Sequence, residues 1–145
     1  AATHGYVEVV KLLLEHGADI TVVNNDNATP LYRASCQGHI DVAKLLLEKG
    51  ANIEATDKNG WTPVNAAAYE SHLEVVKLLL KHGADITTVN IDGATPLYSA
   101  ANKGNIEVVK FLLENGADLA VVNNNGWTPL NAAANNNHLE VVEVL

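Results

Sequence analysis

The sequence predicts an all-α solenoid, in which helix pairs stack in a row and β-turn fingers join them. The main observation is a fixed period: the step from Pro30 to Pro63 recurs from Pro63 to Pro96 and from Pro96 to Pro129. The same step separates four Gly-Ala pairs and four apolar runs, the first of them at residues 12–14. One helix pair cannot bury its own apolar face, so a fixed period of this length predicts units that stack on one another.

The first helix of each unit is predicted to begin at a Thr-Pro pair, such as Thr29 and Pro30. Thr can accept a backbone N–H as an N-cap, and Pro suits the first helical position. Small residues inside this helix, such as Ala67, allow neighbouring helices to approach closely. Glycine in the left-handed conformation can end the helix. Ser71 and Asn137 stand at that glycine position in two units, so we expect local strain near Ser71, because Ser tolerates this conformation less well than Asn.

The second helix is expected over segments such as residues 72–80, where apolar residues recur at helical spacing. Glu74 and Lys77 can pair at i, i+3 on this helix. Gly83 then ends the helix, and a polar segment with turns such as Asn59-Gly60 leads to the next Thr-Pro pair. Each unit is therefore predicted to contain two helices and a finger.

Three segments of one unit closely resemble the ankyrin repeat: residues 95–101, 106–113 and 116–118. The resemblance extends over the whole chain. It implies stacked helix pairs, fingers at about a right angle to them, and a concave surface formed by the fingers and the first helices. It also implies a module without catalytic activity that binds a protein partner on this concave surface.

The resemblance implies a single ankyrin repeat domain over residues 1–145. Alignment with the ankyrin repeat divides this domain into three whole repeats and two partial ones. The whole repeats are residues 24–56, 57–89 and 90–122, and the partial repeats are residues 1–23 and 123–145. Segments such as 60–68 recur two periods later, at 126–134, so pairs of repeats look duplicated. The family usually has His two residues after the Pro, where this chain has Tyr32, Asn65, Tyr98 and Asn131.

Composition excludes several other classes of protein. The 145 residues include 9 Lys and Arg against 17 Asp and Glu, for a formal charge of −8. So acidic a chain is a poor partner for nucleic acid or an anionic membrane. No apolar run approaches the roughly 20 residues of a membrane span. The start shows no signal peptide and Cys36 stands alone, so we expect a cytoplasmic, intracellular location.

The two ends of the array are expected to lack polar capping faces. The chain has no Met, and Val141, Val142 and Val144 look like interior residues, so we expect a piece of a longer array. Apolar faces at both ends would make end-to-end self-association possible.

No motif for catalysis, a cofactor or a metal is found in the sequence. It has no phosphate-binding loop and no nucleophile elbow. Cys36 is expected to be a solvent-facing spare thiol. The shared position of His39, His72 and His138 at the start of the second helix favours a helix-start or inter-repeat hydrogen bond over zinc binding. Acids that follow Gly-Ala, such as Asp85, are expected to make loop hydrogen bonds.

Some positions differ between repeats although the residues around them recur. These positions are the candidate partner-binding residues. They lie in the fingers and on the first helices: Asn25, Asp26, Arg33, Lys58, Asn59, Trp61, Tyr69, Ile91, Asp92, Lys103, Asn124, Asn125 and Trp127. Trp is enriched among binding hot spots, so Trp61 and Trp127 are the predicted anchors. Two alternatives stay open: the array is a structural spacer with no dedicated ligand, or each Trp folds against its own finger and braces the turn.

Overall fold

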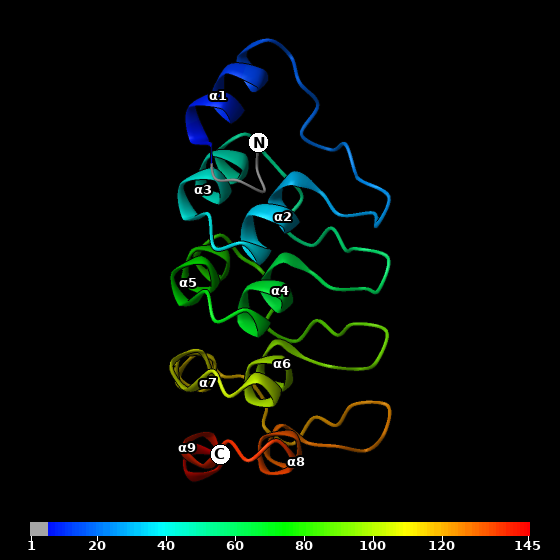
Figure 1. The fold of residues 1–145 in the computed structure, drawn as a ribbon, viewed down its shortest axis with the longest axis vertical. Helices are drawn as coiled ribbons and strands as arrows, with labels where there is room; N and C mark the ends of the chain where they lie inside the picture. The colour runs from blue at the N-terminus through cyan, green and yellow to red at the C-terminus, as the bar shows by residue number, and fades with distance from the viewer. Residues whose placement is uncertain (1–5) are drawn as a thin grey trace.

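A computed structural model describes residues 6–145 as a row of helix pairs (Figure 1). The second helices α1, α3, α5, α7 and α9 form one column, and the first helices α2, α4, α6 and α8 form the other. In chain order they are α1 (Val7–Glu15), α2 (Pro30–Cys36), α3 (Ile40–Glu48), α4 (Pro63–Tyr69), α5 (Leu73–Lys81), α6 (Pro96–Lys103), α7 (Ile106–Glu114), α8 (Pro129–Asn135) and α9 (Leu139–Val144). The fingers project from the column of first helices, so the all-α repeat architecture predicted from the sequence is confirmed.

The Thr-Pro pairs begin all four first helices, as predicted. Each Thr is extended and accepts a hydrogen bond from the backbone N–H three residues later. Thr128 goes further, because the side chain of Asn131 accepts a hydrogen bond from its backbone N–H and completes a capping box. Since capping depends on residues within one turn, the sequence was sufficient to place these helix starts.

Left-handed residues end the first helices, and two of them are not glycine. Gly104 has φ 79°, whereas Ser71 has φ 65° and Asn137 has φ 59°. This left-handed conformation is the cause of the strain predicted at Ser71, because a residue with a β-carbon loses about 1–2 kcal/mol of conformational free energy there.

The core lies between the two columns and runs the length of the stack. Its largest fully buried side chains are Leu31, Leu46, Leu79, Leu97 and Leu112, one or two from each whole repeat. Pairs of alanines on the first helices, such as Ala67 and Ala68, are also fully buried. Small side chains at these positions bring α2, α4, α6 and α8 close together, as the sequence predicts.

The residue at the start of α5, α7 and α9 ties its repeat to the preceding one. His72 donates from Nε2 to the Cys36 carbonyl at 3.2 Å, and His138 donates likewise to the Asn102 carbonyl at 3.1 Å. Asn105 replaces histidine in the repeat between them, and its Nδ2 donates to two carbonyls of the preceding first helix at 2.8 Å. The expected inter-repeat hydrogen bond is therefore confirmed, and its donor can be either imidazole or amide.

Acids after the second helices stabilise their own loops, as predicted. Asp85 accepts from the backbone N–H and hydroxyl of Thr87 at 2.8 and 2.7 Å, and Asp19 makes the same pair of contacts with Thr21. Hydrogen bonds from the Thr residues lower the pKa of both carboxyls. These contacts account for the repeated acids without any acid–base chemistry.

Apolar surface is exposed at both ends of the described chain. In α1, Leu12 is 56% exposed, and an apolar hollow of about 330 Å³ lies between α1, the following loop and α2. At the other end Leu139 is 66% exposed and Val144 is also exposed, whereas Val141 is buried in the core. Residues 1–5 of the partial repeat predicted at 1–23 lie outside the residues that the structure describes.

Candidate functional site

The fingers form a continuous ladder along one edge of the stack. Each finger donates one backbone N–H to the preceding finger: Lys58 to the Asp26 carbonyl at 2.8 Å, Ile91 to Asn59 at 3.0 Å, and Asn124 to Asp92 at 2.9 Å. Because one such hydrogen bond joins each pair of successive fingers, the positions of the finger backbones relative to one another are fixed. Their side chains therefore project from a rigid backbone.

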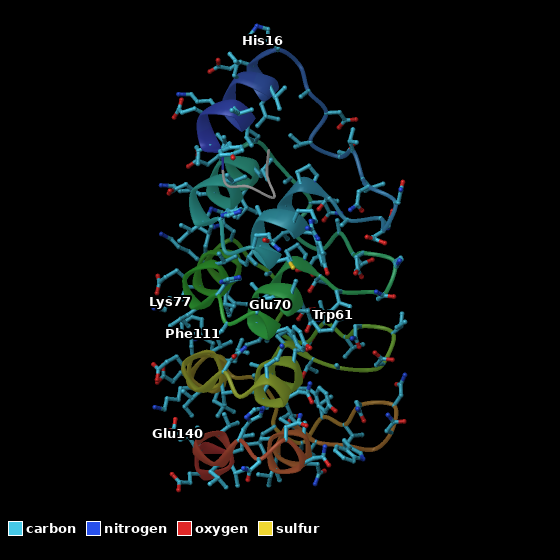
Figure 2. All side chains as sticks on the ribbon, viewed as in Figure 1. His16, Trp61, Glu70, Lys77, Phe111 and Glu140 are labelled. Carbon is cyan, nitrogen blue, oxygen red and sulfur yellow. The ribbon has the colours of Figure 1, made fainter. Side chains whose placement is uncertain are left out.

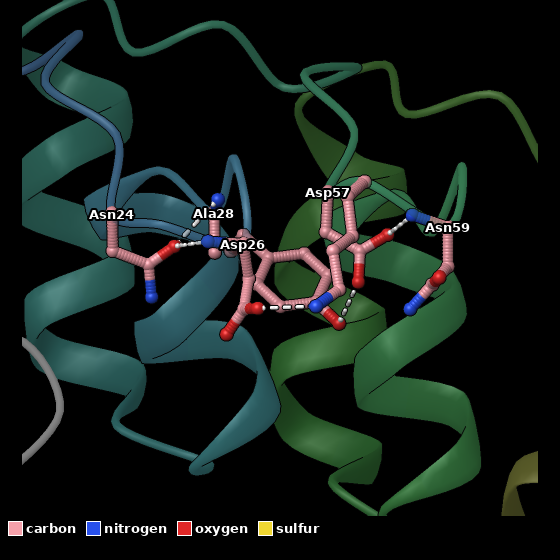
Figure 3. Close-up of polar contacts among 7 residues, drawn as sticks. Asn24, Asp26, Ala28, Asp57 and Asn59 are labelled. Atoms are coloured by element: carbon pink, nitrogen blue, oxygen red, sulfur yellow. Dashed lines mark hydrogen bonds and ion pairs between the residues drawn. The ribbon is translucent and has the colours of Figure 1, made fainter.

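A short polar side chain closes the turn of every finger (Figure 3). Asn24 accepts with Oδ1 from the backbone N–H groups two and four residues later, both at 2.9 Å. Asp57, Asn90 and Asn123 do the same in the next three fingers, at 2.8 to 3.0 Å. This Asx arrangement shapes the turn through local bonds. None of these four residues was among the candidates predicted from the sequence.

The candidate residues in the fingers lie at the surface. Asn25, Asp26, Lys58, Asn59, Asp92, Asn124 and Asn125 are exposed, and Ile91 is 63% exposed. Lys58 bonds Asp26 at 2.7 Å across two fingers, which lowers the pKa of the Asp26 carboxyl. Both side chains are more than half exposed, so this ion pair contributes little to stability.

Candidate residues on and beside the first helices gather around Tyr69. One of them is Trp61, which is labelled beside α4 in Figure 2. Trp61 and Tyr69 meet edge to face, with ring centroids 5.2 Å apart and planes at 78°. Lys103 reaches over from α6 and places Nζ 4.6 Å from the centroid of the Tyr69 ring. The structure thus brings together three of the candidate residues. Arg33, on α2, instead lines the apolar hollow beside α1.

The two tryptophans are not equivalent, although their sequence context is duplicated. Trp61 is partly buried because its indole contacts Tyr69. Trp127 is 38% exposed, and the residue that corresponds to Tyr69 in its repeat is Asn135, which has no ring to offer. Trp61 therefore belongs to an aromatic cluster, whereas Trp127 presents its indole to solvent.

A pocket of about 270 Å³ opens between α2, α4 and the finger that precedes α4. Its lining is formed by aromatic, acidic and small residues: Tyr32, Cys36, Asp57, Asn59, Trp61, Ala66, Tyr69 and Glu70. Only Asn59, Trp61 and Tyr69 were among the candidates from the sequence. The other residues were not predicted because the lining comes from two repeats, and the pattern of one repeat does not show which side chains meet across the stack.

Cys36 lines this pocket and is partly buried, so the expectation of a solvent-facing thiol is wrong. Burial raises the pKa of the thiol, and the nearby Glu70 carboxylate raises it further. A raised pKa disfavours the thiolate that nucleophilic catalysis requires.

Asp57 is the most deeply buried carboxylate of the pocket, at 9% exposed. Its Oδ1 closes the finger turn, and its Oδ2 accepts from the Tyr32 hydroxyl at 3.3 Å (Figure 3). Burial raises the pKa of the Tyr32 phenol, and the charge of Asp57 raises it further. Within residues 6–145 no cationic group lies within ion-pair distance of Asp57.

Two other kinds of site are absent from the described part of the chain. No group of three or more His, Cys, Asp or Glu there is arranged to hold a metal ion. Across residues 6–145 no helix has both the length and the apolar character needed to cross a bilayer.

Comparison with known proteins identifies similarity to one family. A family model described as "Ankyrin repeats (3 copies)" matches residues 1–90 and residues 87–145, which together make up the whole chain. A stretch of 35 residues is 46% identical to a putative ankyrin repeat protein of fowlpox virus (strain NVSL). That stretch is 24% of this chain and 5% of the viral protein, so this similarity extends over about one repeat.

Proposed function

The chain belongs to the ankyrin repeat family, and from this premise we propose that it binds a protein partner on the concave surface formed by its fingers and first helices. Ankyrin repeats generally mediate protein–protein interaction and are generally not catalytic. The partner contacts would come from the candidate residues of the fingers and of α2, α4 and α6.

The observation that carries this proposal is apolar surface on a rigid frame. Ile91 and Trp127 are exposed large apolar side chains at the tip and base of two successive fingers. The inter-finger hydrogen bonds hold the backbone beneath them, so little conformational entropy would be lost when a partner binds. Exposed Trp on a preorganised surface is the pattern expected of a binding hot spot.

The spacing of the repeats suggests the form of the partner. Trp61 and Trp127 are two repeats apart, and stacked helices lie about 8–10 Å from one another, so the two indoles would be roughly 20 Å apart. An extended segment or a helix with two apolar residues at that separation would match them. Trp127 would supply the larger share of the affinity, because its indole is more exposed than that of Trp61.

A comparison of variants on two surfaces tests the proposal. Proteins captured by the wild-type chain are quantified against those captured by Trp127→Ala and Ile91→Ser. The matched control is Ile40→Ser, which removes an exposed apolar side chain from the column of second helices. We expect the two finger variants to lose at least one specific partner that the control retains. Equal capture by all of them would overturn the proposal and favour a structural spacer.

A further inference from the structure

We infer that the pocket between α2 and α4 receives a basic side chain, Lys or Arg, from the partner. The inference rests on the proposed function, since the pocket opens on the concave surface, and it adds a chemical specificity to it. Three features support it: a buried charge with no structural need, aromatic walls that suit a cation, and a neutral copy of the same pocket in the same chain.

The negative charge of Asp57 is not required for the finger turn. Asn24, Asn90 and Asn123 occupy the same position in the other fingers and make the same two hydrogen bonds with an uncharged amide. The contact with the tyrosine hydroxyl does not require it either, because Asn123 donates from Nδ2 to the Tyr98 hydroxyl at 3.0 Å. The three hydrogen bonds that Asp57 accepts offset part of the cost of burying its carboxylate, but no cation pairs with it, so the choice of a charged side chain over an amide calls for another explanation.

The neighbouring cations of the chain are engaged elsewhere. Lys58 pairs with Asp26 at 2.7 Å, and Arg33 lines the hollow on the other side of α2. Glu70 adds a second carboxylate at the wall of the pocket and is itself exposed. Both cations still act on the pocket at longer range, since the charge of Arg33 opposes the rise in the pKa of the Cys36 thiol that burial causes. The negative charge of the pocket is therefore only partly compensated, within a chain whose formal charge is −8.

The aromatic walls suit a cation for a second reason. Tyr32, Trp61 and Tyr69 line the pocket, and aromatic rings attract ammonium and guanidinium groups placed over their faces. Tyr69 already holds one such cation, since Lys103 lies 4.6 Å from its ring centroid. Because Lys103 comes from α6 and the pocket lies toward α2, the partner's cation would approach Tyr69 from the opposite side of α4.

The duplicated repeats supply a neutral copy of this pocket. Tyr32, Trp61 and Ala66 recur as Tyr98, Trp127 and Ala132. Asn59 also recurs, as Asn125, and at the remaining positions the copy has only amides: Asn102, Asn123, Asn135 and Asn136 replace Cys36, Asp57, Tyr69 and Glu70. Both carboxylates and one aromatic wall are thus confined to the first copy, which is the arrangement expected if only this pocket selects a cation.

The volume of the pocket fits one side chain. Pockets for drug-sized ligands start at about 300 Å³, and this one is about 270 Å³. A lysine or arginine could lay its alkyl stem against Trp61 and place its charged end between Asp57 and Glu70. The inference therefore concerns a single residue of a protein partner.

The two indole N–H resonances of the chain provide a direct test by NMR. The probes are the N-acetyl, C-methylamide derivatives of lysine and arginine, with the norleucine derivative as a neutral control that keeps the alkyl stem. We expect saturable shifts of the Trp61 resonance with the two basic probes and no shift of the Trp127 resonance. Shifts of both indoles alike, the same effect from norleucine, or no response to any probe would overturn the inference.

Two substitutions already present in the neutral copy test the role of charge. Asp57→Asn and Glu70→Asn should each weaken probe binding about fivefold, because a charge-assisted hydrogen bond becomes a neutral one. Asp92→Asn is the control, since it removes the same charge from an exposed finger position outside the pocket. Affinity unchanged by Asp57→Asn and Glu70→Asn would also overturn the inference.

These outcomes are independent of the test of the proposed function, because the probes need no partner. Failure of the titration, with partner capture still sensitive to Trp127→Ala, would reject the basic-residue pocket and leave the binding module in place. If the basic probes bind but the finger variants capture the same partners as the wild-type chain, the basic-residue pocket is retained and the binding role of the fingers is rejected.

Discussion

The imidazole of His72 fills the space beside Gly38 that a side chain would need. A β-carbon built on Gly38 would lie 2.5 Å from Nδ1 of His72, and Gly38 itself has φ 72°. The same relationship links Gly104 and His138, again at 2.5 Å. Glycine at this position therefore serves both the left-handed helix end and the hydrogen bond between repeats.

Gly38→Ala should consequently destabilise the chain by about 2–4 kcal/mol, since it combines left-handed strain with displacement of His72. Gly50→Ala is the matched control, because Gly50 has φ 84° and no atom within 4 Å of its β-carbon position. The control should cost only about 1–2 kcal/mol. Urea denaturation measures both values. Equal losses in the two variants would contradict a steric role for His72.

Ser71→Gly should stabilise the chain by about 1 kcal/mol, because glycine adopts the left-handed conformation of Ser71 without strain. A gain of this size would raise the melting temperature by roughly 3 °C for a domain of this length. Asn137→Gly is the comparison, and it should gain less because Asn tolerates this conformation better than Ser. A lower melting temperature for Ser71→Gly would show that its side chain contributes more than its backbone costs.

Trp61→Ala should lower stability more than Trp127→Ala, because only Trp61 packs edge to face on an aromatic ring. A double-mutant cycle with Tyr69→Ala should give a coupling of about 0.5–1.5 kcal/mol. Trp61 packs on Tyr69 of α4 and not on its own finger, so this contact is neither the predicted brace of the turn nor a fully exposed anchor. The exposed Trp127 keeps the proposed role of anchor. No measurable coupling would restore the view that the two residues are equivalent.

Cys36 should react slowly with thiol reagents at neutral pH. Burial and the Glu70 carboxylate both raise the pKa of the thiol, so the reactive thiolate forms only at higher pH than for an ordinary cysteine. The pH profile of the alkylation rate measures this pKa directly. Glu70→Gln should shift the profile to lower pH. A profile with an inflection below that of a free cysteine would contradict the assigned environment.

Hydrogen exchange should be fastest at the two ends of the array, before about Asn24 and after about Ala134. The stability of a repeat protein is a sum of interfaces between neighbours, so these 145 residues, prepared by themselves, should open first at their two end repeats. The exposed Leu12 and Leu139 also favour end-to-end association at high concentration. Leu139→Asp should reduce this association in sedimentation experiments, whereas Ile91→Asp should not. Uniform protection along a strictly monomeric chain would contradict both expectations.

The local rules of the sequence were sufficient for the fold. The Thr-Pro starts, the left-handed ends at Ser71 and Asn137, and the inter-repeat bond of His72 all follow from positions that recur with the period of the prolines. Each depends on backbone conformation within a turn or on a neighbour whose place the period determines. The architecture of a repeat array can therefore be predicted from the spacing of its recurring residues alone.

Only the tertiary structure decided how side chains meet across the stack. The sequence presented Tyr69 and Lys103 as separate candidates, yet Lys103 of the following repeat lies over the Tyr69 ring, 4.6 Å from its centroid. Asp57 was not among the residues predicted from the sequence, yet the fold buries its carboxylate against Tyr32 of the preceding repeat. The physical reason is that the period governs the backbone, while burial and charge at the surface depend on which side chains fill the adjoining positions in the neighbouring repeat.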